Sequence, residues 1–164
     1  DEKQQIVGLG LDNIIAISMP DAVLIANKNR AQNVKEVVVE LKKNKIEQAE
    51  TFPKDNRPWG WFEVLTVGEE FKVKRIIVKP GGILSLQSHK HRSEHWVVVQ
   101  GVAKVTINKD VRFIPTGESV YIPLGSQHRL QNTERTYMIL IEVQTGSYLG
   151  EDDIIRYEDL YSRT

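Results

Sequence analysis

Residues 81–96 read Gly-Gly-Ile-Leu-Ser-Leu-Gln-Ser-His-Lys-His-Arg-Ser-Glu-His-Trp, and they hold three of the chain's four histidines. The fourth histidine also falls within residues 81–132. Residues two apart on a β-strand face the same side. Gln87, His89 and His91 are therefore expected to converge, and Glu94 can reach the same point from the next strand.

This clustering of side chains predicts a divalent metal site. Neutral imidazole nitrogens and carboxylate oxygens suit Zn, Fe, Mn, Co or Ni. The chain contains no cysteine, so a closed structural zinc site made of thiolates is excluded. Disulfides and thiol chemistry are excluded for the same reason.

Composition narrows the remaining classes of function. The 164 residues suffice for one domain with a substantial core and an appendage. Lysine plus arginine equals aspartate plus glutamate at 22 each, so no net field favours nucleic acid or an anionic membrane. No apolar run approaches the roughly 18 residues of a membrane span, and the cytoplasm is the expected compartment. Asp1 in place of methionine, without a signal peptide, predicts a fragment of a longer protein.

The sequence divides into an appendage (1–46), a linker (47–56) and a larger domain (57–164). Apolar runs at 6–18 and 22–26, separated by a Met-Pro-Asp turn, predict two strands in the appendage. A helix over about 30–46 follows, because Val34, Val37, Val38 and Leu41 recur at helical spacing. The linker belongs to a polar stretch, residues 47–58, that carries two prolines.

The larger domain is predicted to be all-β. Its short apolar runs alternate with Gly and Pro turns, which is typical of a sandwich or barrel. Lys72 and Lys74 are expected on the solvent side of an alternating strand. The tail, residues 152–163, is compatible with a short helix or with an extended arm over the barrel. The runs lie at 61–67, 71–79, 83–88, 96–100, 102–107, 111–114, 119–122, 128–132 and 136–144.

Two motifs resemble those of the cupin family. Gly117 to Asn132 reads G-x5-P-x-G-x2-H-x3-N, which resembles the second cupin motif and contributes His128. Gly81 to Gly101 has the spacing of the first motif, with Gln87 in the place of its first histidine. The resemblance implies a jelly-roll barrel (a double-stranded β-helix) that binds a metal through Gln87, His89, Glu94 and His128. His91 remains the alternative to Gln87 as a ligand.

A longer pattern resembles the type II phosphomannose isomerases and covers nearly everything from residue 57 onward. The segments that carry this resemblance are 57–60, 84–101, 121–130 and 142–156. Residues 12–41 resemble the end of the β-helical region of a mannose-1-phosphate guanylyltransferase, the domain that usually precedes this cupin. The nucleotide-binding Gly-rich signature of that transferase is absent from the chain, so the fragment itself is not expected to transfer guanylyl groups.

The resemblance implies a mannose-6-phosphate isomerase that produces fructose 6-phosphate reversibly and supplies GDP-mannose synthesis. Zinc is the expected metal, with Co, Mn, Ni and Mg as alternatives. A sugar phosphate is the expected partner, the barrel edges allow a homodimer, and a guanylyltransferase domain is expected in the parent chain. The alternative is a cupin that binds metal and sugar phosphate, or serves a structural purpose, without turnover.

Isomerisation requires a group that moves a proton between C1 and C2. His91 and His95 are the histidines not assigned to the metal and are the candidates. Arg92 joins them as a catalytic candidate and as the first choice to clamp the phosphate, because guanidinium binds phosphate through two bonds. The further candidates for substrate binding are Arg57, Arg129 and Lys79.

Overall fold

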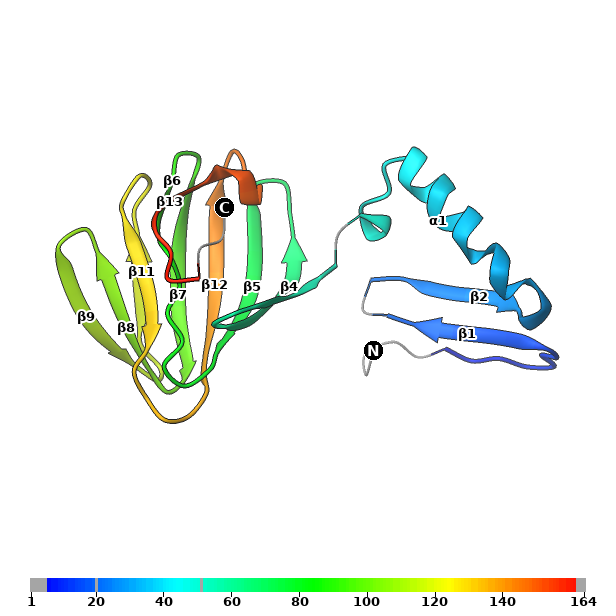
Figure 1. Cartoon of the computed structure of the whole chain (residues 1–164), viewed down its shortest axis with the longest axis horizontal. Coiled ribbons are helices and arrows are strands. Elements are labelled where there is room, and N and C mark those ends of the chain that lie inside the picture. The colour runs from blue at the N-terminus through cyan, green and yellow to red at the C-terminus, as the bar shows by residue number, and fades with distance from the viewer. Residues whose placement is uncertain (1–5, 20, 51, 162–164) are drawn as a thin grey trace. The chain divides into compact units, whose positions relative to one another are not determined.

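A computed structural model describes residues 6–19, 21–50 and 52–161. Predictions that fall on residues 1–5, 20, 51 and 162–164, including the Pro20 turn and the end of the tail, lie outside this part of the chain. The protein divides into two compact units, Asp1–Pro53 and Lys54–Thr164 (Figure 1). No helix in the described residues is long and apolar enough to cross a membrane.

The N-terminal unit is a hairpin followed by a helix. Strands β1 (Ile14–Ser18) and β2 (Val23–Asn27) pair antiparallel, and the 3₁₀ helix η1 (Lys28–Asn33) leads into α1 (Val34–Lys43). Another 3₁₀ turn, η2 (Glu47–Ala49), follows. The Asn27 side chain begins η1 by accepting a hydrogen bond of 2.9 Å from the Asn29 amide. The strand and helix predictions for this segment are therefore confirmed.

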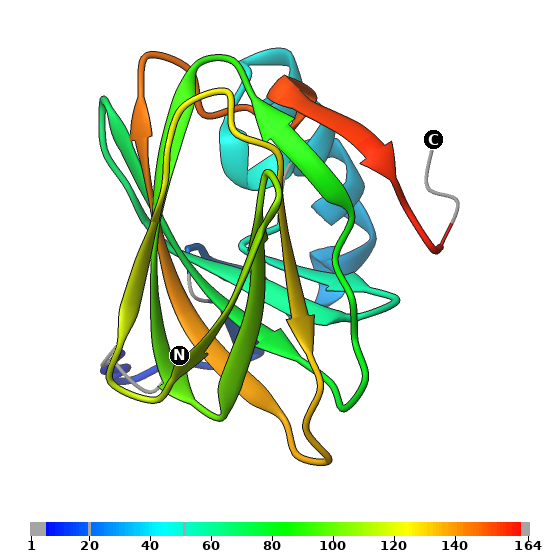
Figure 2. The same ribbon diagram turned by 90° about the vertical axis from the view of Figure 1, so that its left-hand side faces the viewer.

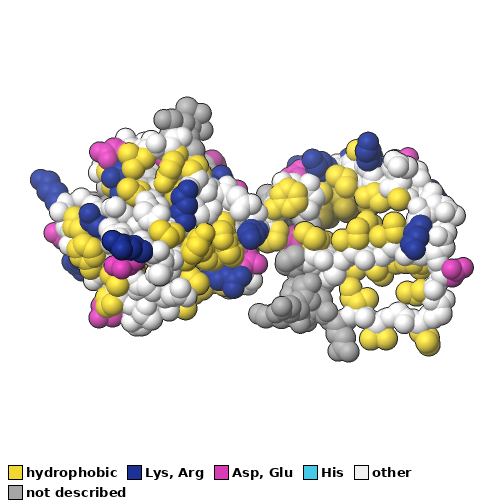
Figure 3. Space-filling model, turned by 60° about the horizontal axis from the view of Figure 1, so that its bottom comes forward, with side chains coloured by type: hydrophobic (Ala, Val, Ile, Leu, Met, Phe, Trp, Pro, Cys, Tyr) yellow, Lys and Arg dark blue, Asp and Glu magenta, His cyan; other side chains and the backbone are white. Residues whose placement is uncertain are grey.

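Apolar side chains of this unit remain accessible. None of its described residues is buried, and the predicted valine stripe of α1 stays partly exposed. Figure 3 shows hydrophobic side chains in rows on its surface. Within the described residues the hairpin and helix thus form no dry core of their own, because two strands and one helix bury too little apolar surface.

The C-terminal unit is a barrel of two antiparallel sheets (Figure 2). One sheet has six strands in the order β10-β7-β12-β5-β4-β3, and the other has five in the order β13-β6-β11-β8-β9. The strands are β3 (Lys54–Arg57), β4 (Gly60–Val67), β5 (Phe71–Val78), β6 (Leu86–His89), β7 (Arg92–Gln100), β8 (Val102–Ile107), β9 (Asp110–Pro115), β10 (Ser119–Ile122), β11 (His128–Asn132), β12 (Met138–Gly146) and β13 (Ile154–Glu158).

Side chains that alternate between the two faces of each strand build the core. In β7, Trp96 and Val98 are buried while Val97 and Val99 are exposed, as a period of two requires. The core collects buried apolar residues from both sheets, which are Trp59, Ile76, Val78, Trp96, Val98, Ala103, Val105, Ile114, Val120, Ile122, Leu130, Met138 and Leu140. The prediction of an all-β barrel is confirmed.

The inner face of the six-stranded sheet is apolar at one end of its strands and polar at the other. On β12, Met138 and Leu140 belong to the apolar core, whereas Glu142 and Gln144 continue the same face with buried polar groups. Lys74, on β5, pairs in register with Glu142 and is only 5% exposed. The prediction that Lys74 faces solvent is therefore wrong, because the strand period places it on the inner face together with Ile76.

The first strand and the tail of this unit differ from what the sequence predicted or left undecided. Residues 54–57, which overlap the expected linker, form β3 and pair with β4. The tail is extended rather than helical after a short 3₁₀ turn, η3 (Glu151–Asp153), because β13 pairs antiparallel with β6. We call residues 147–161 the C-terminal arm.

Candidate metal centre and adjoining pocket

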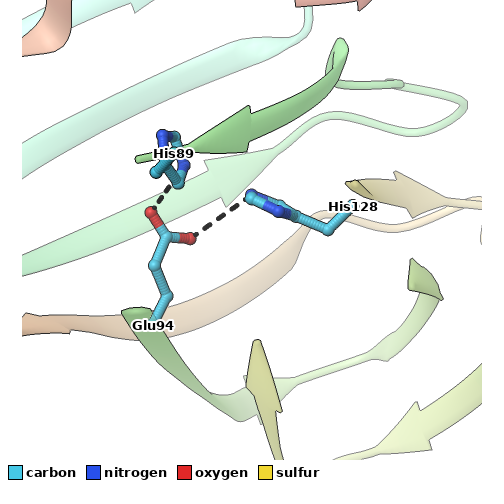
Figure 4. A group of neighbouring side chains, drawn as sticks. All are labelled: His89, Glu94 and His128. Carbon is cyan, nitrogen blue, oxygen red and sulfur yellow. Dashed lines mark ion pairs between the residues drawn. The ribbon is translucent and has the colours of Figure 1, made fainter. Parts of the chain in front are cut away.

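Three buried side chains from three strands meet inside the barrel. His89 ends β6, Glu94 lies early in β7, and His128 begins β11 (Figure 4). Nε2 of His89 lies 3.0 Å from Oε1 of Glu94, and Nε2 of His128 lies 3.7 Å from Oε2 of the same carboxylate. All three residues are at most 2% exposed. One nitrogen or oxygen atom from each lies within 4.8 Å of those of the other two, so the group can hold a metal ion.

The hydrogen bonding of the imidazoles fits a bound metal. Nδ1 of His128 lies 2.9 Å from the Ser126 carbonyl oxygen, so Nδ1 carries the proton and donates it. This leaves the Nε2 lone pair directed at the cluster, the arrangement that orients metal-ligating histidines. Nε2 of His128 and both ring nitrogens of His89 are buried without a hydrogen bond, and a buried polar atom without a partner is costly. A cation at this point would satisfy Nε2 of both rings.

The charge state of this cluster also favours a cation. Burial acts to raise the pKa of Glu94, but His89, His128 and Arg92 outweigh it and hold this pKa well below its usual range. Burial lowers the pKa of His128, although the Glu94 charge partly opposes this effect. A carboxylate beside a neutral imidazole offers the kind of donors that a divalent metal requires.

The two candidates for a fourth ligand lie in different surroundings. Gln87 shares the parity of His89 on β6, pairs in register with His128, and lines a pocket beside the cluster. His91 lies in the turn after β6, where the strand alternation has ended. Its side chain is 52% exposed and its Nδ1 lies 2.8 Å from Oδ1 of Asp153, on the C-terminal arm. Gln87 is thus placed toward the cluster, whereas His91 is engaged with the arm.

A pocket opens next to Glu94 and carries both signs of charge. Its walls come from β3 to β7, from β12 and from the C-terminal arm. The lining residues are Arg57, Trp59, Phe62, Lys74, Ile76, Leu84, Ser85, Gln87, Arg92, Glu94, Glu142, Gln144, Glu151, Ile154 and Arg156.

Most cations of this pocket already have partners. The buried Arg92 donates a bond of 2.7 Å to the Gly150 carbonyl oxygen and lies 3.4 Å from Glu94. Lys74 forms an ion pair with Glu151. Arg156 is exposed and makes no ion pair or side-chain hydrogen bond within the described chain. The pocket therefore offers one uncommitted guanidinium at its edge.

Four buried polar residues of the pocket, Lys74, Ser85, Glu142 and Gln144, were not predicted as site residues. Nε2 of Gln144 donates to Oε1 of Glu142 at 2.8 Å and to Oε1 of Glu94 at 3.3 Å. Burial, followed by the nearby Glu94 charge, raises the pKa of Glu142 to about 8. The sequence did hold a signal for Glu142 and Gln144. They continue the alternate, inward positions of Met138 and Leu140 on the same strand, but they are polar.

The remaining predicted residues lie away from the pocket or at its wall. His95 is exposed on β7 and contacts the Tyr121 ring, with 4.6 Å between ring centroids. Lys79 is exposed and does not line the pocket, and Arg129 forms an ion pair of 2.7 Å with Glu158. Arg57 lines the pocket and pairs with Asp55 at 2.6 Å.

Comparison with known families bears on both units. Residues 42–159 match the family model described as mannose-6-phosphate isomerase C-terminal, which is well over half of the chain. The chain belongs to the mannose-6-phosphate isomerase C-terminal family. Residues 2–41 match a second model, described as a MannoseP isomerase/GMP-like beta-helix domain.

Curated members related to this chain are much longer proteins. The xanthan biosynthesis protein XanB of Xanthomonas campestris pv. campestris is 50% identical over 156 residues, which are 95% of this chain and 33% of that protein. The alginate biosynthesis protein AlgA of Pseudomonas syringae pv. tomato is 47% identical, with coverage of 95% and 32%. A mannose-1-phosphate guanylyltransferase of Escherichia coli is 44% identical, with coverage of 99% and 34%. The chain thus spans about a third of these relatives.

Solved structures show the same fold as this family member. An RmlC-like cupin from Shewanella frigidimarina aligns with a TM-score of 0.54 at 22% identity, covering 63% of this chain and 88% of the other. An oxalate decarboxylase of Bacillus subtilis aligns with a TM-score of 0.59 at 22% identity, covering 71% and 33%. These likenesses establish the cupin fold alone.

Proposed function

We propose that the cupin unit is a metal-dependent isomerase that interconverts mannose 6-phosphate and fructose 6-phosphate and so supplies GDP-mannose synthesis. The observation that carries this proposal is the buried His89, Glu94 and His128 cluster beside a cation-lined pocket. Its presence in a chain of the mannose-6-phosphate isomerase C-terminal family makes a sugar phosphate the substrate of choice.

His89, Glu94, His128 and Gln87 are the proposed metal ligands. Their nitrogen and oxygen donors suit zinc first, with cobalt, manganese, nickel and magnesium as alternatives. When bound, the metal would act as a Lewis acid that polarises a substrate oxygen. Gln87 accepts a hydrogen bond of 2.9 Å from the Ser85 hydroxyl through Oε1, which orients its amide at the pocket wall.

Cationic side chains at the pocket wall are proposed to hold the phosphate. Arg156 is uncommitted, and Arg57 stands on the opposite sheet with part of its surface exposed. Guanidinium groups bind phosphate oxygens in pairs. Arg92, Arg129 and Lys79 stay predictions as substrate or catalytic residues, and Arg92 is engaged with Gly150 and Glu94.

His91 and His95 also stay predictions as proton carriers. Neither lines the pocket beside the metal cluster. Both are exposed, His91 against Asp153 and His95 beside Tyr121 on the outer side of β7. Their placement gives no support to the assignment.

A second function has a specific observation in its favour. The relative from Escherichia coli is named for guanylyltransferase activity alone, although it is 44% identical over 162 residues. We therefore keep the alternative of a cupin that binds metal and sugar phosphate, or supports an attached guanylyltransferase domain, without turnover. The guanylyltransferase domain and a homodimer are proposals for the whole protein.

A coupled isomerase assay distinguishes these functions. The chain is stripped with chelator and then supplied separately with zinc, cobalt, manganese, nickel or magnesium. The isomerase proposal expects turnover of mannose 6-phosphate that disappears with chelator and returns with metal, and that Glu94→Gln lacks. Bound metal and a folded chain without turnover under any metal would overturn it in favour of the binding module.

A further inference from the structure

Glu142 is a buried carboxylate without a counter-ion. It lies on the inner face of β12, is 5% exposed, and lines the pocket. Lys74 pairs in register with Glu142, but its ammonium group forms an ion pair with Glu151 instead. No ion pair involves Glu142 within the described chain, and its one side-chain hydrogen bond comes from Gln144. A buried carboxylate held this way costs stability, and such groups in clefts are candidates for chemistry.

The other two carboxylates of the pocket are already committed. Glu94 belongs to the cluster with His89 and His128. Glu151 pairs with Lys74, and its side chain is 45% exposed. The residues that line the pocket include no histidine. Of the three carboxyl groups that line the pocket, Glu142 is therefore the one that remains available to a substrate.

Gln144 fixes Glu142 relative to the cluster. The same amide nitrogen donates to Glu142 at 2.8 Å and to Glu94 at 3.3 Å. On the neighbouring strand β7, Glu94 pairs in register with Gln144, and Trp96 pairs with Glu142. Glu142 and Glu94 therefore line the same pocket and are bridged by one amide.

We infer that Glu142 is the residue that carries the proton between C2 and C1 of the sugar phosphate, an inference that rests on the proposed isomerase function. The Glu142 carboxylate removes the C2 proton, the C2–H electron pair forms the C1–C2 double bond, and the carbonyl π electrons pass to O1. The O2 hydroxyl proton then moves to O1. The C2–O2 carbonyl forms as the double-bond electrons take the proton back from Glu142 at C1.

This sequence of steps conserves protons and electrons, and it needs no co-reactant. It also uses a residue whose burial supports the task. The raised pKa of Glu142, about 8, brings its titration close to neutrality, where a group can both accept and return a proton.

The test compares the metal-loaded wild-type chain with Glu142→Gln, which keeps size and hydrogen-bonding capacity. The inference expects kcat for mannose 6-phosphate to fall by about 100-fold or more, the range typical of acid–base groups. Metal content and substrate affinity should change by less than about threefold, well below a loss of one good contact. The incorporation of deuterium from D₂O at C1 of the product should fall in parallel.

Two further variants separate catalysis from structure. Glu142→Ala is expected to recover part of its activity when formate is added, because a small carboxylate can occupy the vacated space. Glu118→Gln, an exposed residue outside the pocket, is the matched control and should behave as the wild type.

Three outcomes would overturn the inference. Turnover by Glu142→Gln within about twofold of a working wild type would remove the proton-transfer role while leaving the isomerase intact. Loss of metal or of substrate binding in that variant, without formate rescue of Glu142→Ala, would assign Glu142 a structural role. No turnover by the wild type with any metal would overturn the proposed function itself, and the inference with it.

Discussion

Nδ1 of His91 lies 2.8 Å from Oδ1 of Asp153, and this contact joins the turn after β6 to the C-terminal arm. The same carboxylate also accepts hydrogen bonds of 3.2 Å from the backbone amides of Lys90 and His91. Burial acts to raise the pKa of Asp153, but the three His91 and Lys90 contacts outweigh it and lower this pKa. A histidine from the metal motif thereby anchors the wall of the pocket.

Removing this anchor should loosen the arm. Asp153→Ala deletes the acceptor for three donors and is expected to destabilise the chain by about 1–3 kcal/mol. Hydrogen exchange measured by mass spectrometry should show faster exchange in residues 148–158 than in β12. Asp152→Ala is the matched control, since exposed Asp152 accepts one bond from the Tyr148 hydroxyl. Equal exchange in the two variants would contradict the anchoring role.

Metal affinity should discriminate between Gln87 and His91. Because Gln87 lies beside the cluster and His91 faces Asp153, Gln87→Ala is expected to weaken metal binding by about tenfold or more. His91→Ala should leave the affinity within about threefold. Competition titration with a chromophoric chelator measures both. The reverse order of effects would make His91 the ligand.

Glu142 should make the stability of the metal-free chain fall as pH rises. Its pKa is raised from 4.5 to about 8 in the folded chain, so between these values the folded state holds a proton that the unfolded state has released. The contribution is complete below pH 4.5 and disappears as pH approaches 8, with a slope of at most ~1.4 kcal/mol per pH unit.

The free energy of unfolding by denaturant, measured from about pH 5 to about pH 8, tests this. The contributions of other titrating groups cancel when Glu142→Gln is compared with the wild type. The variant should gain stability relative to the wild type as pH rises. Parallel pH profiles for the two proteins would show that Glu142 titrates normally.

Asn132 should be among the most sensitive positions of the barrel. It is fully buried, and its Nδ2 lies 3.0, 3.1 and 2.8 Å from the carbonyl oxygens of Val78, Lys79 and Thr136. Its Oδ1 accepts from the Glu134 amide at 3.0 Å. Asn132→Ala removes these hydrogen bonds from the barrel interior and should cost ~3 kcal/mol.

Chemical unfolding of Asn132→Ala, compared with Gln131→Ala, checks this expectation. Gln131 is half-buried on the same strand and its side chain makes no hydrogen bond within the described chain, so its loss should cost less than about 1 kcal/mol. Similar losses in the two variants would contradict the structural role of the Asn132 amide.

Strand positions and the metal cluster could be predicted because both depend on local patterns. The runs at 102–107, 119–122 and 128–132 coincide with β8, β10 and β11, since alternation and Gly or Pro turns are local signals. His89, Glu94 and His128 followed from motif spacing. His91 was harder to place, because the turn at residues 90–91 ends the alternation that aligned it with His89.

The pocket could not be predicted in the same way. Lys74 lies on β5, and Glu142 and Gln144 lie on the neighbouring strand β12, whose register is set by long-range pairing. Arg156 reaches the pocket only because β13 pairs with β6, an association between residues some 65 apart. Charged residues in a strand are most simply assigned to its solvent face, and this assignment failed where the barrel interior is polar.

The C-terminal arm has a consequence for how the protein is made. All proposed metal ligands precede residue 129 in the sequence, whereas Glu151, Ile154 and Arg156 of the pocket wall come last. Synthesis runs from the N-terminus, so a growing chain acquires its metal-binding residues before it acquires that wall. A newly made barrel without the arm would therefore expose its proposed metal ligands through an open side, and the pocket wall would be completed only when β13 pairs with β6.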